Sequence, residues 1–267
     1  SGKHRDFLAY WLRRYELGNI KAIVRGRIAG LSSTAIQAQL RDLGPLASLP
    51  VEELLRTEDA AELLRRLEHS PYADIARQAR AIYEERGDLL SLDSAVDKGY
   101  YLALDRRYRG LAQEDRGPLA PLMGVLLDRL NLVWLLRYRF SYDLAPAHAY
   151  YLLVPPGRWL GSQRLMDLVQ MTSVEEVLRA LPDSLAALMT GVTTVPQAEA
   201  ALDRYVAQVA WEVLRRTSFN LARAFAYLVL RERNIRRLHA IFKGRGLHLP
   251  PALIRGAVGL GPLPHPG

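Results

Sequence analysis

Cysteine is absent from the 267 residues of the chain, and lysine is scarce. Without cysteine the chain can form no disulfide bond, no zinc or iron–sulfur site with thiolate ligands, and no thiol nucleophile. Because lysine is scarce, arginine supplies most of the 36 basic side chains and of the net charge of +8. The only lysines are Lys3, Lys21, Lys98 and Lys243.

Long apolar runs are missing as well. No stretch comes near the roughly 18 consecutive apolar residues of a membrane-spanning helix, so we expect the chain not to cross a membrane. Residues 1–15 hold five charges and lack the apolar core of a signal peptide. Apolar residues at 49% and charged residues at 24% are ordinary values for a folded globular chain.

The residue patterns of an active site are also lacking. The sequence has no glycine-rich loop ending in Gly-Lys-Ser/Thr to bind a nucleotide phosphate. Asp93 and Asp97 share one face of a predicted helix, like the magnesium-binding carboxylates of helical prenyl-diphosphate enzymes. Such an enzyme needs a second acidic cluster, which Glu199 and Asp203 match only weakly. We therefore expect no catalytic residue, no metal and no cofactor. The six histidines lack metal-ligand spacing; they are His4, His69, His148, His239, His248 and His265.

The charge is unevenly distributed along the chain. Residues 1–30 are mainly basic, residues 31–124 are slightly acidic, and no acidic residue follows Glu232. This asymmetry favours an acidic or polyanionic partner, either a nucleic acid, an anionic membrane surface or an acidic protein. A solvated basic helix face explains the same pattern equally well. The basic residues after Glu232 are Arg233, Arg236, Arg237, Lys243, Arg245 and Arg255.

Apolar residues recur at helical spacing through nearly the whole sequence, and no region alternates like a strand. The pair Ser70-Pro71 predicts the start of a helix that ends near Gly87. Pro196 predicts the start of a longer helix that runs through Leu214, and residues 218–243 continue the pattern. These patterns predict an all-α fold.

Local signals refine the helix boundaries. Ser173, with Glu176 three residues later, has the pattern of a capping box. Gly117-Pro118 is expected to interrupt helix. The last residues, 259–267, are rich in glycine and proline, and we expect a flexible tail there.

A sequence motif recurs about every 105 residues. In the first two copies an acidic residue precedes asparagine by three places, and Ile or Leu follows the asparagine. In the third copy the acid is only two places before the asparagine. Such an asparagine is best explained as a hydrogen-bonding residue that fixes the packing of equivalent helices. The motif residues are Glu16 and Asn19, Asp128 and Asn131, and Glu232 and Asn234.

Other features keep the same repeat. Asp97 and Asp203 lie in matching segments upstream of the second and third asparagines, and each motif ends in basic residues. Positive charge is stabilised at a helix C-terminus by about 0.3–1 kcal/mol, which alone could explain those basic ends. We predict helical repeats at residues 1–88, 89–194 and 195–257, the first and third incomplete, followed by the tail at 258–267. The basic ends are Arg25 and Arg27, Arg137 and Arg139, and Lys243 and Arg245.

The order and spacing of these motifs resemble the C subunit of A-type and V/A-type rotary ATPases, which is named d in the eukaryotic vacuolar enzymes. That family carries three copies of a helix with an Asp-x-x-Asn-Leu motif and a basic end. Here Glu16-Leu-Gly-Asn19-Ile20 and Asp128-Arg-Leu-Asn131-Leu132 stand in the first two places. Glu232-Arg-Asn234-Ile235 stands in the third and departs from the pattern. The resemblance covers roughly residues 5–255.

The resemblance implies a funnel of three pseudo-threefold helical domains with no catalytic activity. Such a protein sits on the proteolipid rotor ring and receives the central shaft, made of D- and F-type subunits, so that rotation is coupled to proton or sodium transport. It implies a peripheral position at the cytoplasmic face of a membrane, without small-molecule substrate or nucleic acid. The six basic helix ends would then pair with acidic groups of the shaft or the ring. The alternative is a basic helical module that binds nucleic acid or an acidic protein.

Overall fold

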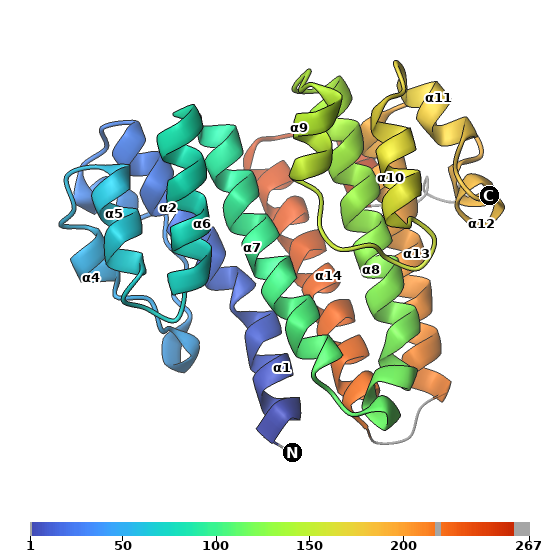
Figure 1. Cartoon of the computed structure of the whole chain (residues 1–267), viewed down its shortest axis with the longest axis horizontal. Helices are drawn as coiled ribbons and strands as arrows, with labels where there is room; N and C mark the ends of the chain where they lie inside the picture. Colours follow the sequence, from blue (N-terminus) through green and yellow to red (C-terminus); the bar gives the residue numbers. More distant parts are fainter. Residues whose placement is uncertain (1, 217–219, 259–267) are drawn as a thin grey trace. The chain divides into compact units, whose positions relative to one another are not determined.

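The computed structural model describes residues 2–216 and 220–258, and within these ranges every regular element is helical (Figure 1). The predicted all-α fold is therefore confirmed. The chain divides into two compact units, Ser1–Leu111 and Ala112–Gly267. The division into three repeats, with boundaries at residues 88, 194 and 257, stays a prediction. The expected flexible tail falls on residues 259–267, outside the described residues.

The first unit is built around α7 (Leu89–Arg109), which contacts α1 (Gly2–Leu12), α2 (Arg14–Ile28) and α6 (Ala73–Arg86). Its core contains the fully buried side chains of Phe7, Ile23 and Tyr100. The shorter elements are α3 (Ser33–Gln37), η1 (Gly44–Leu46), α4 (Val51–Leu54) and α5 (Ala60–Leu67).

The second unit is built on three long helices that pack on one another: α8 (Gln113–Phe140), α13 (Val195–Arg216) and α14 (Leu221–Gly246) (Figure 1). By length and composition α8 could cross a membrane, but two thirds of its most apolar window (67%) is buried inside the protein. It has the burial of a core helix. The shorter elements are α9 (Pro146–Tyr151), α10 (Ser162–Val169), α11 (Val174–Arg179), α12 (Asp183–Ala186), η2 (Ala187–Met189) and α15 (Pro251–Ala257).

Two predicted helix boundaries are wrong. The α8 helix continues through Gly117-Pro118, because Pro118 lies near its start and the buried remainder of the helix outweighs the lost backbone hydrogen bond. Ser70-Pro71 does not open α6, which begins at Ala73. Instead Ser70 Oγ accepts a hydrogen bond from the Tyr72 backbone N–H at 3.1 Å and forms a turn.

Of two other predicted helix signals, one is confirmed and one is confirmed in part. Ser173 Oγ accepts a hydrogen bond from the backbone N–H of Glu176 at 3.1 Å, at the start of α11. The Glu176 carboxylate bonds to the N–H of Thr172, one residue earlier than a capping box requires. Gly87 ends α6 in the left-handed conformation, with φ of 71°.

The three helices that carry the repeated motif, α2, α8 and α14, end in the same way. Each is followed by a residue in the left-handed conformation and then by a leucine whose N–H returns to a carbonyl of the last helical turn. A short helix, α3, α9 or α15, then begins. The left-handed residues are Gly30, Asp143 and His248, and the returning bonds are Leu31 to Gly26 (2.9 Å), Leu144 to Tyr138 (2.8 Å) and Leu249 to Gly244 (2.9 Å).

Candidate functional site

The repeated acid and asparagine of α2 are buried and hold the loops that follow the helix. The Glu16 carboxylate accepts hydrogen bonds from Ser48 Oγ at 2.6 Å and from the Leu49 N–H at 2.8 Å, and also from the Ser48 N–H and the Tyr72 hydroxyl. Burial, and then the bond to Glu16, raises the pKa of Tyr72. Three separate segments therefore meet at one carboxylate.

Asn19 lies one turn further along α2 and binds the backbone of a single residue through both the oxygen and the nitrogen of its side-chain amide. Its Nδ2 donates to the carbonyl of Arg41 at 2.9 Å, and its Oδ1 accepts from the N–H of the same residue at 2.9 Å. We call an acid and asparagine that hold the following loop in this way an acid–asparagine clamp.

The second clamp, on α8, repeats this arrangement with Asp128 and Asn131. Asp128 accepts hydrogen bonds from three successive backbone N–H groups, at residues 158–160, over 2.9–3.0 Å. Asn131 Oδ1 accepts from the Val154 N–H at 3.0 Å, and its Nδ2 donates to the Pro155 carbonyl at 3.1 Å. Burial raises the pKa of Asp128, although the three N–H groups act in the opposite direction.

The third copy forms no such clamp within residues 220–258. Asn234 is exposed, and Glu232 forms a 3.8 Å ion pair with Arg236 of its own helix. In α2 the clamp asparagine is seven residues before Gly26, whereas Asn234 is ten residues before the corresponding Gly244. Measured from the helix end, Arg237 therefore occupies the clamp asparagine's place on α14. The sequence motif and the helix end are out of register in this copy.

The paired carboxylates considered for magnesium form ion pairs with basic side chains of the same unit. In the first unit, Asp97 forms an ion pair with Lys21 at 2.7 Å, and Asp93 accepts from Arg25 Nε at 2.9 Å. Burial raises the pKa of Asp97, and the charge of Lys21 partly opposes this. No group of three or more metal-ligating side chains is found in the described part of the chain.

The second unit repeats these ion pairs between α8 and α13. Arg129 contacts both Asp203 at 2.6 Å and Glu199 at 2.9 Å. Arg137 reaches the other oxygen of Glu199 at 2.5 Å. Each acidic helix is thus tied to the motif-bearing helix before it.

Of the six basic helix ends, four have hydrogen bonds or ion pairs inside their own unit. Besides Arg25 and Arg137, Arg27 donates to Ser33 Oγ at 2.9 Å and to the carbonyl of Leu55. Arg139 donates to three backbone carbonyls, of Leu144 at 2.6 Å, Val169 at 2.7 Å and Met171 at 3.4 Å. Lys243 and Arg245 are exposed, and their side chains have no hydrogen bond or ion pair among residues 2–216 and 220–258. These two are the basic ends most available to a partner.

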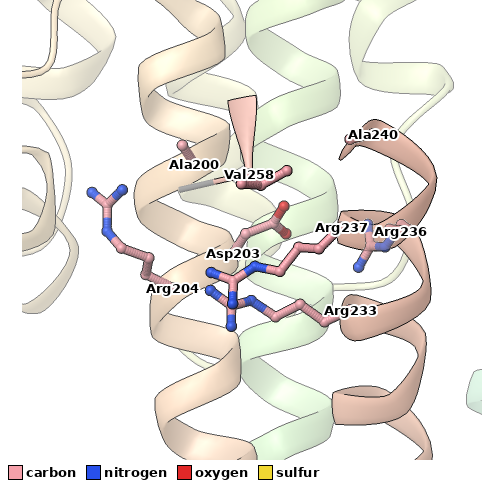
Figure 2. Close-up of a pocket in the computed structure, with 8 residues that line it drawn as sticks. All are labelled: Ala200, Asp203, Arg204, Arg233, Arg236, Arg237, Ala240 and Val258. Carbon is pink, nitrogen blue, oxygen red and sulfur yellow. The ribbon is translucent and has the colours of Figure 1, made fainter. Parts of the chain in front are cut away.

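No motif in the sequence marks the pocket between α13 and α14. This pocket, of about 130 Å³, is lined by Ala200, Asp203, Arg204, Arg233, Arg236, Arg237, Ala240 and Val258. We call it the arginine pocket. Figure 2 shows Arg233 and Arg237 reaching from α14 toward Asp203 on α13. The signal that could have found it is the lack of acidic residues after Glu232.

The chain is similar over most of its length to known proteins of one kind. The ATP synthase (C/AC39) subunit family matches residues 1–257. The A-type ATP synthase C subunit of Methanocaldococcus jannaschii is 25% identical over 259 residues, which are 94% of this chain and 64% of that protein. The protein of the same name from Halobacterium salinarum is 26% identical over 256 residues, 92% of this chain and 71% of that protein. The chain thus spans 64% of the length of the first of these relatives.

Proposed function

Because the chain belongs to the ATP synthase (C/AC39) subunit family, we propose that it is the non-catalytic central-stalk subunit of a V/A-type rotary ATPase. In this function it transmits torque between the rotating shaft, of D- and F-type subunits, and the proteolipid ring. The transported ions are protons or sodium ions. The protein lies at the cytoplasmic face of the membrane and contacts the membrane only through the ring.

The observation that carries this proposal is the repeated internal bracing of the long helices. A part that transmits torque must resist bending and twisting, and closely packed interiors are only slightly compressible. In each unit a buried clamp ties a long helix to its following loop, and ion pairs tie it to the next long helix. The buried polar groups of these clamps, and the ion pairs, hold separate segments of the chain together.

The exposed end of α14 is the proposed contact with acidic groups of the shaft or ring. Lys243 and Arg245 lie in its last turn, where no carboxylate among the described residues neutralises them. Charged groups at an interface chiefly set orientation and the rate of association. The other basic ends are less suited to this function, because Arg25, Arg27, Arg137 and Arg139 already have partners.

The proposal is tested by assembly and coupling in the whole rotary complex. We expect the chain to co-purify with the other ATPase subunits in mild detergent, and Lys243→Glu with Arg245→Glu to weaken that association and lower the number of ions pumped per ATP. The matched control is Arg215→Glu with Arg216→Glu, which reverses two exposed charges at the end of α13. Failure of the unaltered chain to join the complex would contradict the proposal.

The alternative function, binding of a nucleic acid or of an acidic protein, depends on the same exposed basic surface of α14. A salt-sensitive shift of DNA or RNA by the chain at physiological ionic strength would favour this alternative. We expect no such shift, because the basic end of α14 would act alone: the basic ends of the other two motif helices already have partners in their own units.

A further inference from the structure

We propose that the arginine pocket binds a phosphoryl group. This function goes beyond torque transmission and does not depend on it. The ligand chemistry is that of a phosphate with at least two free oxygens, whether inorganic phosphate, the terminal phosphates of a nucleotide, or the headgroup of an anionic lipid.

The pocket has an excess of positive charge. Among the residues that the structure describes, the one carboxylate lining the pocket, that of Asp203, is 2.6 Å from Arg129 Nε and is already neutralised by that side chain. Arg236 has a distant partner in Glu232, at 3.8 Å. The other three guanidinium groups, of Arg204, Arg233 and Arg237, have no ion pair or hydrogen bond with any residue that the structure describes.

These guanidinium groups lie close enough to disfavour one another. Burial, and next the charge of Arg237, lowers the pKa of Arg233. Arg236 and Arg204 act in the same direction, and only Asp203 acts against them. An anion placed among them would relieve both the repulsion and the lack of hydrogen-bond acceptors.

One residue of the pocket, Arg237, lies at a position of α14 that corresponds to a clamp position of α2 and α8. On α2 and α8 the clamp acid presents carboxylate oxygens, and backbone N–H groups of the following loop donate to them. Counted from the helix end, α14 has Asn234 and Arg237 at the two clamp positions. Of these two residues only Arg237 lines the pocket, so where the first two helices carry an asparagine that binds a loop backbone, the third carries a guanidinium donor.

The number of donors favours phosphate over carboxylate. One guanidinium can satisfy a carboxylate by two parallel hydrogen bonds, whereas a phosphate has more acceptor oxygens and up to two negative charges. The two converging guanidinium groups of Arg233 and Arg237, which have no ion pair with the described residues, suit the larger ligand, and a volume of about 130 Å³ can hold it. Arg233 and Arg237 extend from α14 toward α13, whereas the guanidinium of Arg204 on α13 points away from them (Figure 2). A phosphate held by the two arginines of α14 would therefore lie against α13.

The test uses the full chain and inorganic phosphate, pyrophosphate and ATP as probes, in isothermal calorimetry at constant ionic strength set with sodium chloride. We expect saturable binding of at least one probe, weakened about tenfold or more in the variant Arg233→Gln with Arg237→Gln. The control is Arg215→Gln with Arg216→Gln, which removes two exposed arginines from the end of α13 and should bind like the unaltered chain. Because the pocket variant relieves repulsion between like charges, its thermal unfolding should show an intact fold.

A second arm distinguishes the sources of the phosphate. Phosphatidylcholine vesicles with and without phosphatidylglycerol are tested by flotation, and binding that needs both phosphatidylglycerol and the two arginines assigns the site to a lipid headgroup. Three results overturn the proposal: no binding of any phosphoryl probe or vesicle, equal weakening in the control variant, or binding of a glutamate-rich peptide without binding of a phosphoryl probe. The last result would identify a protein carboxylate as the ligand.

Discussion

Gly26 of α2 lies directly against Ile36 of α3, so closely that a Cβ atom on the glycine would overlap Ile36 Cγ1. The same contact recurs in the second unit, where a Cβ on Gly244 of α14 would lie 2.7 Å from Cγ1 of Ile254. Both pairs are ten residues apart. The close approach of a long helix to the short helix after it is therefore shared by α2 and α14, and it does not depend on the acid–asparagine clamp, which α14 lacks.

Gly26→Ala should destabilise the chain by about 1–3 kcal/mol, because the added methyl group overpacks the contact with Ile36. Gly18 is the matched control in the same helix: it is exposed, and no atom beyond its two neighbours and the backbone of its own helix lies within 4 Å of its added Cβ. Gly18→Ala should raise stability by about 0.5–1 kcal/mol, since alanine is the better helix former. The measurement is urea unfolding followed by circular dichroism. Adding Ile36→Ala to Gly26→Ala should remove part of the loss specific to the clash, and a Gly26→Ala variant as stable as Gly18→Ala would contradict the packing argument.

Asn131→Ala should cost about 2–4 kcal/mol of unfolding free energy. The substitution leaves the buried Val154 N–H and the Pro155 carbonyl without their partners, and each unsatisfied buried group costs roughly 1–3 kcal/mol. The same change at Asn234, which is exposed, should alter stability by less than about 0.5 kcal/mol. Chemical denaturation of the two variants side by side measures the difference. Equal effects would mean that the two asparagines have the same function despite their different surroundings.

Helix type was predictable from the sequence because periodicity alone carries that information. The boundaries were less so. Pro118 has the local chemistry of a helix breaker, but it lies near the start of a long buried helix. The packing of the rest of that helix outweighs the one backbone hydrogen bond that the proline cannot form. Ser70 has the chemistry of an N-cap, but its hydroxyl stabilises a turn one step earlier.

The site was predictable in part. The recurrence of Asn19 and Asn131 indicated a packing function, but their partners lie 22–24 residues away in irregular loops, and no local pattern encodes such a contact. For Asn234 the motif itself was misleading, because α14 has three more residues between this asparagine and Gly244 than α2 has between Asn19 and Gly26. The arginine pocket needed the pairing of α13 with α14, which depends on long-range packing.

Asp97 should make stability depend on pH in a direction opposite to that of an ordinary ion-paired carboxylate. Burial raises the pKa of Asp97 above its usual value of 3.8, so the folded chain holds this proton more tightly than the unfolded chain. The contribution of Asp97 to the unfolding free energy therefore rises as the pH falls through the raised pKa toward the usual one, and is constant above both values. Asp97→Asn should remove this contribution, which the difference between the two unfolding curves across acidic pH would measure. The carboxyl pKa itself can be followed by carbon NMR, and a value below 3.8 would refute the burial argument.

Arg139→Gln should destabilise the second unit, whereas Arg245→Gln should not. Each of the two arginines directly follows the residue whose carbonyl accepts the returning leucine N–H at its helix end. Arg139 donates to the carbonyls of Leu144 and Val169, whereas Arg245 is exposed. Hydrogen bonds from a charged donor contribute about 1.5–3 kcal/mol, so a loss of roughly that size is expected at Arg139 and less than about 0.5 kcal/mol at Arg245. In the assembled complex the order should reverse, because Arg245 is proposed to contact a partner and Arg139 is not. A loss of coupling with Arg139→Gln at temperatures where the variant stays folded, together with normal coupling by Arg245→Gln, would show that the internal bracing and not the exposed charge transmits the torque.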